Sequence, residues 1–244
     1  MSSFCSSFTV VDIETTGLEP KRDKITEIGA IRVEDGRITD TFHVLVNPGR
    51  KLETRITELT GLTDEVLRKA PFIGEVIGDF VEFETTGCLL GHSILFDYSF
   101  LKRAAVNEGK TFEKKGIDTL AISRRYLQEL ESRSLPYLSA YFGIAHEAHR
   151  ALSDVEAAWE LYEILKEKFG REEDAFKYFL PKELVYKVKK EGPVTKKQIE
   201  QLRRFLSCYG LESEYDINQM TKNEASRYLD RLISLHGRIP PRNG

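Results

Sequence analysis

The chain has 244 residues, of which 41% are hydrophobic and 31% charged, a composition typical of a globular protein and not of a disordered or fibrous one. No stretch approaches 18 uninterrupted apolar residues, and the first residues carry neither a basic nor an apolar segment, so we expect a cytoplasmic protein without a membrane span. The net charge of -3 is uneven, because residues 182–244 hold 13 Lys and Arg against 8 Asp and Glu.

Three strands are predicted at the start of the chain. The first lies in the β-branched stretch 8–17, the second covers 24–33 and the third covers 38–46. Asp35 and Gly36, between the second and the third, are typical of a hairpin turn. The chain therefore opens with a three-stranded meander.

Helices and short strands alternate after the meander. Helical periodicity covers residues 56–70 and 73–84, and a fourth strand follows at 88–92. A helix at 96–107 and a short strand at 116–119 come next, and the strand leads into a helix that begins at residue 120. Two further helices are predicted at 135–142 and 151–169. This order predicts an α/β architecture in which helices flank a mixed sheet.

Residues 193–236 are predicted to form a small helical hairpin module. A Thr followed three residues later by Gln or Glu, the capping-box pattern, occurs at Thr195 and Thr221, and each precedes an amphipathic helix. Residues 171–192 are expected to be a helical connector and residues 237–244 a disordered tail. The positive charge of the module makes it a candidate for phosphate contacts, with a solvated helical surface as the alternative.

Asp12 and Glu14 are candidate metal ligands on the first strand. They lie two positions apart, so their side chains project from one face of the strand. Buried carboxylates are costly unless they are paired or bind a metal, so one interpretation is a site for Mg²⁺ or Mn²⁺. Two solvated acids on a half-exposed edge strand are the alternative, and the pair alone does not decide between them. Two further acids, Asp97 and Asp154, lie near predicted helix starts, where the helix dipole alone also favours them.

Three motifs, taken together, resemble those of the DEDDh 3′-to-5′ exonuclease superfamily. They are Asp-Ile-Glu-Thr-Thr-Gly-Leu at 12–18, Gly-His-Ser-x-x-Phe-Asp-x-x-Phe-Leu at 91–101 and His-Arg-Ala-Leu-x-Asp at 149–154. Within the superfamily the chain looks most like the proofreading (epsilon) subunit of bacterial DNA polymerase III and its stand-alone relatives. The resemblance implies a ribonuclease H-like fold with a five-stranded mixed sheet, in an exonuclease domain at 1–170.

The resemblance also implies roles for single residues. It makes His149 the general base, an imidazole that titrates near neutral pH. It implies four catalytic metal ligands for two Mg²⁺ or Mn²⁺ ions, namely Asp12, Glu14, Asp97 and Asp154. Substrate-binding roles are implied for Thr15, Thr16, Gly17, Leu18, His92 and Phe96. Ser93 departs from the family pattern, which commonly has Asn there. No partner pattern is seen for three histidines, assigned to surface or core: His43, His146 and His236.

The predicted activity is hydrolysis of phosphodiester bonds at single-stranded 3′ ends, releasing nucleoside 5′-monophosphates in proofreading or repair. DNA is favoured as substrate because the motifs look most like those of the polymerase-associated group. An exoribonuclease stays open, since the same motifs serve RNA in this superfamily. The other alternative is a catalytically idle scaffold that binds nucleic acid or a polymerase. A DNA polymerase acting in trans is the expected protein partner.

Overall fold

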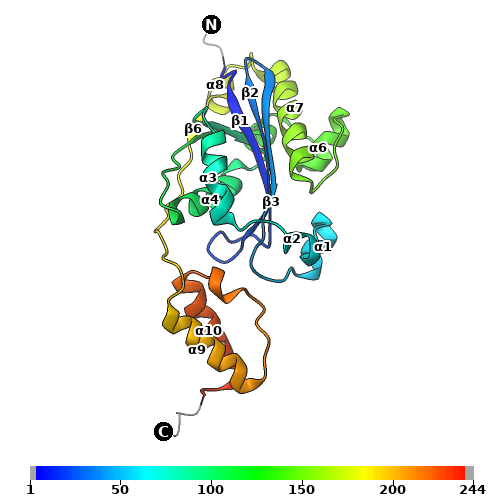
Figure 1. Cartoon of the computed structure of the whole chain (residues 1–244). Helices are drawn as coiled ribbons and strands as arrows, with labels where there is room; N and C mark the ends of the chain where they lie inside the picture. Colours follow the sequence, from blue (N-terminus) through cyan, green and yellow to red (C-terminus); the bar gives the residue numbers. More distant parts are fainter. Residues whose placement is uncertain (1–3, 240–244) are drawn as a thin grey trace.

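One mixed sheet has the strand order β3-β2-β1-β4-β5-β6 (Figure 1). The structure is a computed structural model and describes residues 4–239. Its strands are β1 (Phe8–Thr15), β2 (Ile25–Glu34), β3 (Arg37–Leu45), β4 (Cys88–Gly91), β5 (Lys115–Asp118) and β6 (Lys182–Glu183). The first three pair antiparallel, β4 and β5 run parallel to β1, and β6 is antiparallel to β5. The predicted α/β fold is confirmed, with one more strand than expected.

Helices cover both faces of the sheet, which explains the continuous apolar run of β1. Val10 packs with α5, α6 and α7, whereas its neighbour Val11 packs with α3 and α4, because side chains alternate along a strand. The helices of this part are α1 (Thr54–Thr60), α2 (Asp64–Leu67), α3 (Ile73–Phe83), α4 (Ile94–Asn107), α5 (Thr119–Tyr126), α6 (Leu135–Phe142) and α7 (Ala151–Phe169).

Residues 171–192 are not the helical connector that the sequence predicted. They contain only the short helix α8 (Ala175–Phe179), and then β6 and an extended segment. The extended segment alternates strictly in burial, with Leu184 partly buried and Val185 70% exposed, which is the period of a strand. The backbone N–H of Leu184 donates to the carbonyl of Lys114 at 3.0 Å, so the segment borders the sheet edge.

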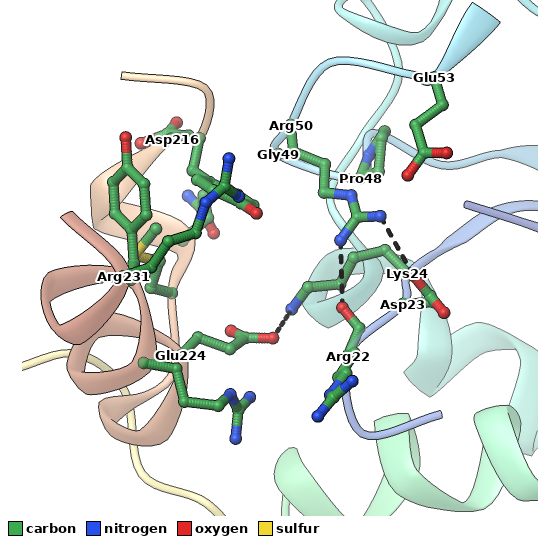
Figure 2. A pocket seen from close by; sticks show the side chains of 15 residues that line it. Arg22, Asp23, Lys24, Pro48, Gly49, Arg50, Glu53, Asp216, Glu224 and Arg231 are labelled. Carbon is green, nitrogen blue, oxygen red and sulfur yellow. Dashed lines mark hydrogen bonds and ion pairs between the residues drawn. The ribbon is translucent and has the colours of Figure 1, made fainter. Parts of the chain in front are cut away.

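The C-terminal helices α9 (Lys196–Tyr209) and α10 (Lys222–His236), with the 3-10 turn η1 (Ile217–Gln219), enclose an apolar cluster of their own. Both predicted capping boxes are present, at Thr195 and at Thr221. An ion pair between Lys24 and Glu224 joins this module to the first part of the chain (Figure 2). Residues 240–244 of the expected disordered tail lie outside the described residues. Among the described helices, none has the length and apolarity that a membrane crossing requires.

Candidate active site

The acidic residues of β1 lie where the start of α7 approaches the sheet. Asp12 pairs with Gly29 of β2, and a Cβ atom at Gly29 would lie 2.6 Å from the carbonyl carbon of Ala151. Only a glycine allows α7 to begin so close to β2. Because Asp154 follows one turn later, the same contact brings its carboxylate to the face that carries Asp12 and Glu14.

Three carboxylates converge at this point. One oxygen from each of Asp12, Glu14 and Asp154 lies within 4.8 Å of the other two. Burial, and then the charges of Asp154 and Glu27, raise the pKa of Glu14 to about 8. Burial, and then the charges of Asp97 and Asp154, raise the pKa of Asp12 well above its usual value. A divalent cation would relieve this repulsion, and carboxylate oxygens are the ligands that hard cations prefer.

Asp97 lies beside the three oxygens but is not one of that group. Its Oδ1 atom accepts a hydrogen bond from the backbone N–H of Ile13 at 3.1 Å, and the residue is 3% exposed. After burial, its charge contributes most to the raised pKa of Asp12. The fourth predicted ligand is therefore next to the cluster, with one oxygen bonded to the strand between Asp12 and Glu14.

The start of α4 holds Asp97 in this place. Ser93 caps the helix with φ 78° and ψ 41°, the left-handed region, and its backbone N–H donates to the Oδ1 atom of Asp118 at 3.0 Å. Asn tolerates this conformation better than most residues, which is a physical reason for the Asn of the family pattern. The backbone turn is thus kept in this chain, although Ser replaces Asn.

His149 lies at the open side of the acidic cluster. Its Nδ1 atom is 3.8 Å from the Oε1 atom of Glu14, and its side chain is 42% exposed. Its backbone has φ 64°, a left-handed conformation that costs free energy for a non-glycine residue and is common at functional sites. An accessible imidazole beside four acids is suitably placed for the predicted role of general base.

His146 contacts the site, although no motif or spacing predicts this contact. Its Nε2 atom lies 2.7 Å from the Oδ1 atom of Asp154, and its side chain is 4% exposed. The backbone N–H of Arg150 donates to the other oxygen of Asp154 at 2.9 Å. His146 and Asp154 are eight residues apart across a loop and a helix start, so no strand or helix period links them.

His43 likewise has a partner that the sequence analysis missed. Its Nε2 atom lies 2.7 Å from the Oε1 atom of Glu27, a buried residue of the neighbouring strand. Glu27 pairs with Leu45 and His43 with Gly29, so the two side chains are diagonal neighbours on one face of the sheet. The predicted pairing of the second and third strands was the signal that could have found this contact.

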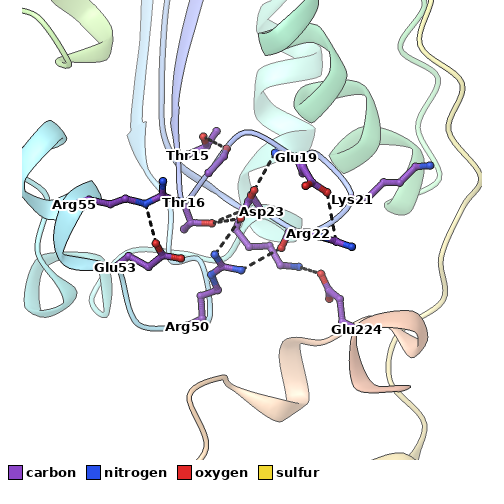
Figure 3. A network of polar contacts seen from close by, with 12 residues as sticks. Thr15, Thr16, Glu19, Lys21, Arg22, Asp23, Arg50, Glu53, Arg55 and Glu224 are labelled. Carbon is purple, nitrogen blue, oxygen red and sulfur yellow. Dashed lines mark hydrogen bonds and ion pairs between the residues drawn. The ribbon is translucent and has the colours of Figure 1, made fainter. Parts of the chain in front are cut away.

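The loop after β1 holds the first group of predicted substrate-binding residues (Figure 3). The hydroxyl of Thr15 donates to the carbonyl of Gly17 at 2.6 Å, and that of Thr16 donates to Asp23 at 3.4 Å. Both hydroxyls therefore shape the loop itself. Leu18, at its tip, is 82% exposed and free to meet a base, so its wedge role stays a prediction.

The second group of predicted substrate-binding residues is bonded within the protein. The Nδ1 atom of His92 lies 2.9 Å from the hydroxyl of Thr119, and its Nε2 atom 2.8 Å from the carbonyl of Arg133. Burial lowers the pKa of His92, so we expect a neutral ring. Phe96 is partly buried with its ring centroid 5.1 Å from that of Phe100. Contacts of His92 and Phe96 with a nucleotide stay predictions.

Residues 9–162 match the model of the exonuclease family of ribonuclease T type, and the chain belongs to this family. It is 34% identical over 170 residues to the DNA polymerase III subunit epsilon of Aquifex aeolicus, which covers 67% of this chain and 84% of that protein. The resemblance to epsilon subunits is therefore confirmed, and residues 9–162 form a domain of the exonuclease family.

Further comparisons extend the relationship. The chain is 39% identical over 169 residues to the PolC-type DNA polymerase III of Caldanaerobacter subterraneus subsp. tengcongensis, a match of 68% of this chain and 12% of that much longer protein. Escherichia coli exonuclease I, in a zinc-bound complex with single-stranded DNA, superposes with a TM-score of 0.63 at 20% identity over 71% of this chain and 42% of its own. Exonuclease X, in complex with duplex DNA that has a 5′ overhang, superposes with a TM-score of 0.53 at 22% identity. This match covers 67% of the present chain and 93% of the exonuclease X chain. These two structures share the fold.

Proposed function

We propose that the chain is a 3′-to-5′ exonuclease that hydrolyses single-stranded DNA from its 3′ end and releases nucleoside 5′-monophosphates. The observation that carries the proposal is the convergence of oxygens from Asp12, Glu14 and Asp154 within 4.8 Å, beside Asp97 and His149. A chain of the exonuclease family with this arrangement has the groups that phosphodiester hydrolysis needs. The cluster and the family together indicate that divalent metal is used.

The four carboxylates would hold two Mg²⁺ or Mn²⁺ ions, which supply charge neutralisation at the phosphate and at the leaving 3′ oxygen. His149 takes the proton of the attacking water as the water oxygen bonds to phosphorus and the 3′ oxygen of the preceding nucleotide departs. Its exposed position lets the ring reach a water in the open side of the cluster. One carboxylate oxygen of Asp97 accepts a hydrogen bond from the backbone N–H of Ile13, and this bond fixes the direction of the other oxygen.

Single-stranded DNA is the proposed substrate because the relatives include a DNA polymerase III subunit epsilon, and the fold is shared with an exonuclease solved with single-stranded DNA. The proposed partner is a DNA polymerase on a separate polypeptide, because the chain is similar to an epsilon subunit. Digestion of matched 20-residue DNA and RNA strands tests the substrate. We expect DNA to be degraded at least about tenfold faster, and faster digestion of RNA would favour the exoribonuclease alternative.

The activity is tested with a 5′-labelled single strand and Mg²⁺. We expect a ladder that shortens from the 3′ end, and a loss of about 10³-fold or more in rate for Asp12→Ala and Asp154→Ala, about 4 kcal/mol of transition-state stabilisation. Glu156→Ala is the matched control, because Glu156 is an exposed acid two residues from Asp154 on the same helix. Strand binding without metal-dependent turnover in the unmodified protein would instead support the idle scaffold.

A further inference from the structure

A cleft separates the C-terminal module from the first part of the chain (Figure 2). It has a volume of about 430 Å³. One wall comes from the β1–β2 loop and from residues 48–53, and the other comes from residues 215–231 of the module. The two walls are distant in the sequence, so the cleft exists only because the module is docked.

Partly buried ion pairs and a backbone hydrogen bond fix both walls. Lys24 and Glu224 form an ion pair of 2.5 Å across the cleft, with side chains 29% and 14% exposed. Burial alone would raise the pKa of Glu224, but Lys24 holds it below its usual value. The backbone N–H of Asp216 donates to the carbonyl of Gly49 at 2.6 Å. These contacts make the cleft a built feature of the fold.

Within the first wall, Arg50 and Asp23 form a second ion pair, of 3.1 Å, with side chains 15% and 16% exposed (Figures 2 and 3). Asp23 also accepts hydrogen bonds from the hydroxyl of Thr16 and from the backbone N–H of Glu19. The charges of Arg50 and Lys24 are therefore already neutralised by Asp23 and Glu224, and these two pairs serve the structure of the cleft.

Three other arginines that line the cleft are exposed, and each has only a weak partner. Arg22 pairs with exposed Glu19 at 3.4 Å, and Arg231 pairs with half-exposed Glu214 at 3.3 Å. Arg227 donates to the carbonyl of Lys21 at 3.2 Å. Exposed ion pairs contribute little free energy, so these guanidinium groups can exchange partners for a phosphate, which their fork geometry suits. The remaining acids of the lining are Glu53 and Asp216.

The cleft is close to the acidic site along the same loop. The backbone N–H of Thr16 donates to the carbonyl of Lys24 at 2.9 Å, which closes the loop that carries Leu18 and Arg22. Four residues span at most about 14 Å, and a stacked strand rises about 3.4 Å per nucleotide. A strand that passes Leu18 would therefore reach the level of Arg22 within about four nucleotides.

We propose that this cleft binds the sugar-phosphate backbone of the strand whose 3′ end lies in the acidic site, upstream of the cleaved bond. Arg22, Arg227 and Arg231 supply the phosphate contacts, and the module retains the strand between cleavage steps. The inference rests on the proposed function for its substrate. In this proposal, the helical module adds contacts to long strands, and the exonuclease domain alone does not supply these contacts.

The test compares a triple variant, Arg22→Gln, Arg227→Gln and Arg231→Gln, with a matched control. The control is Arg37→Gln, Lys168→Gln and Arg171→Gln, three exposed cations that do not line the cleft. Along α7, Lys168 also lies about 21 Å from Asp154 of the acidic site. Affinity for a 20-nucleotide DNA strand is measured as a function of salt concentration. These measurements use an Asp12→Ala background, so that the strand is not cleaved while binding is measured. Cleavage rates of a 20-residue strand and of a trinucleotide are measured without that change.

We expect the triple variant to bind the 20-residue strand at least about tenfold more weakly, with a salt slope smaller by about 2, because each lost phosphate contact lowers it by about 0.7. Its cleavage of the trinucleotide falls less than twofold, and the control variant behaves like the unmodified protein. Arg22→Gln alone, which breaks no contact with the module, accounts for about one third of the change in slope.

Unchanged affinity and salt slope in the triple variant would overturn the proposal. An equal loss for the trinucleotide and the 20-residue strand would also overturn it, because that result means a distorted loop and not a lost backbone contact. Failure of the proposed function looks different: the unmodified protein would then cleave neither strand, whatever the binding data for the cleft.

Discussion

His146 and Asp154 lie 2.7 Å apart, between Nε2 and Oδ1, on either side of the loop that carries His149. A carboxylate oxygen accepts, so the imidazole N–H donates, and the backbone of Arg150 donates to the second oxygen. A carboxylate oxygen has a further lone pair for a metal ion, so these hydrogen bonds leave Asp154 able to act as the proposed ligand and fix its orientation.

Loss of the His146 contact should weaken metal binding. We expect His146→Ala to bind Mn²⁺ about 10- to 100-fold more weakly, the usual effect of removing a partner that orients a ligand. Isothermal titration calorimetry measures the affinity. His236→Ala is the control, because His236 is an exposed residue of α10. Equal Mn²⁺ affinities in the two variants would show that His146 does not orient Asp154.

The stability of the metal-free protein should fall as pH rises. The pKa of Glu14 is raised to about 8 in the folded chain, so between its ordinary value near 4.5 and 8 the folded state holds a proton that the unfolded state has lost. Stability therefore decreases across this window. We expect Tm in EDTA to fall by at least about 4 °C between pH 5 and pH 8, where roughly 1 kcal/mol corresponds to 2–4 °C.

Added Mg²⁺ should reverse this loss, and its effect on Tm should be larger at pH 8 than at pH 5. Glu14→Gln removes the titrating group, so its Tm in EDTA should depend less on pH. A Tm in EDTA that rises from pH 5 to pH 8 would mean that Glu14 is not held protonated by its neighbours.

Ser93→Asn should stabilise the fold. Ser93 has φ 78°, a region in which Asn is less strained than Ser, so we expect about 0.5–1 kcal/mol of added stability and a Tm higher by a few degrees. Ser134→Asn is the matched control, because Ser134 also precedes a helix but has φ -67°. Thermal unfolding that gives the two variants the same Tm would refute the strain at Ser93.

Gly17→Ala should impair the loop that we propose contacts the substrate. A Cβ atom there would lie 2.5 Å from an oxygen of Asp23 and would displace it from Thr16 and Arg50. Small displacements at a binding loop are costly, so we expect kcat/KM on single-stranded DNA to fall about 10- to 100-fold.

Gly78→Ala is the control for that substitution, since its Cβ would meet only the flexible end of Lys110 and alanine favours a helix. Steady-state kinetics on one DNA strand compare the two variants. Full activity of Gly17→Ala would show that the loop accommodates a side chain and that Asp23 does not fix it.

The sequence predicted those parts of the fold that a local period or a motif records. Asp12 and Glu14 share a face because a strand alternates, and the three exonuclease motifs lie on the elements expected for them. The dense charge of residues 171–192 predicts a helix, whereas the segment after α8 is extended. Its alternating burial from Leu184 to Val188 depends on a sheet edge that a distant part of the chain supplies.

Contacts that depend on loop shape or on docking could not be predicted. His146 reaches Asp154 only through the path of the loop between them. Lys24 and Glu224 are 200 positions apart, and each resembles many other exposed charges in the sequence. No period or motif distinguishes such a pair until both elements have packed.

The central claim is that four carboxylates gather around divalent cations. Anomalous diffraction from crystals soaked with Mn²⁺ and a nucleoside 5′-monophosphate tests it most directly. We predict two Mn²⁺ peaks about 3.5–4 Å apart, coordinated by oxygens of Asp12, Glu14, Asp97 and Asp154. The absence of any Mn²⁺ peak within coordinating distance of Asp12, or peaks that neither Asp97 nor Asp154 coordinates, would contradict the account.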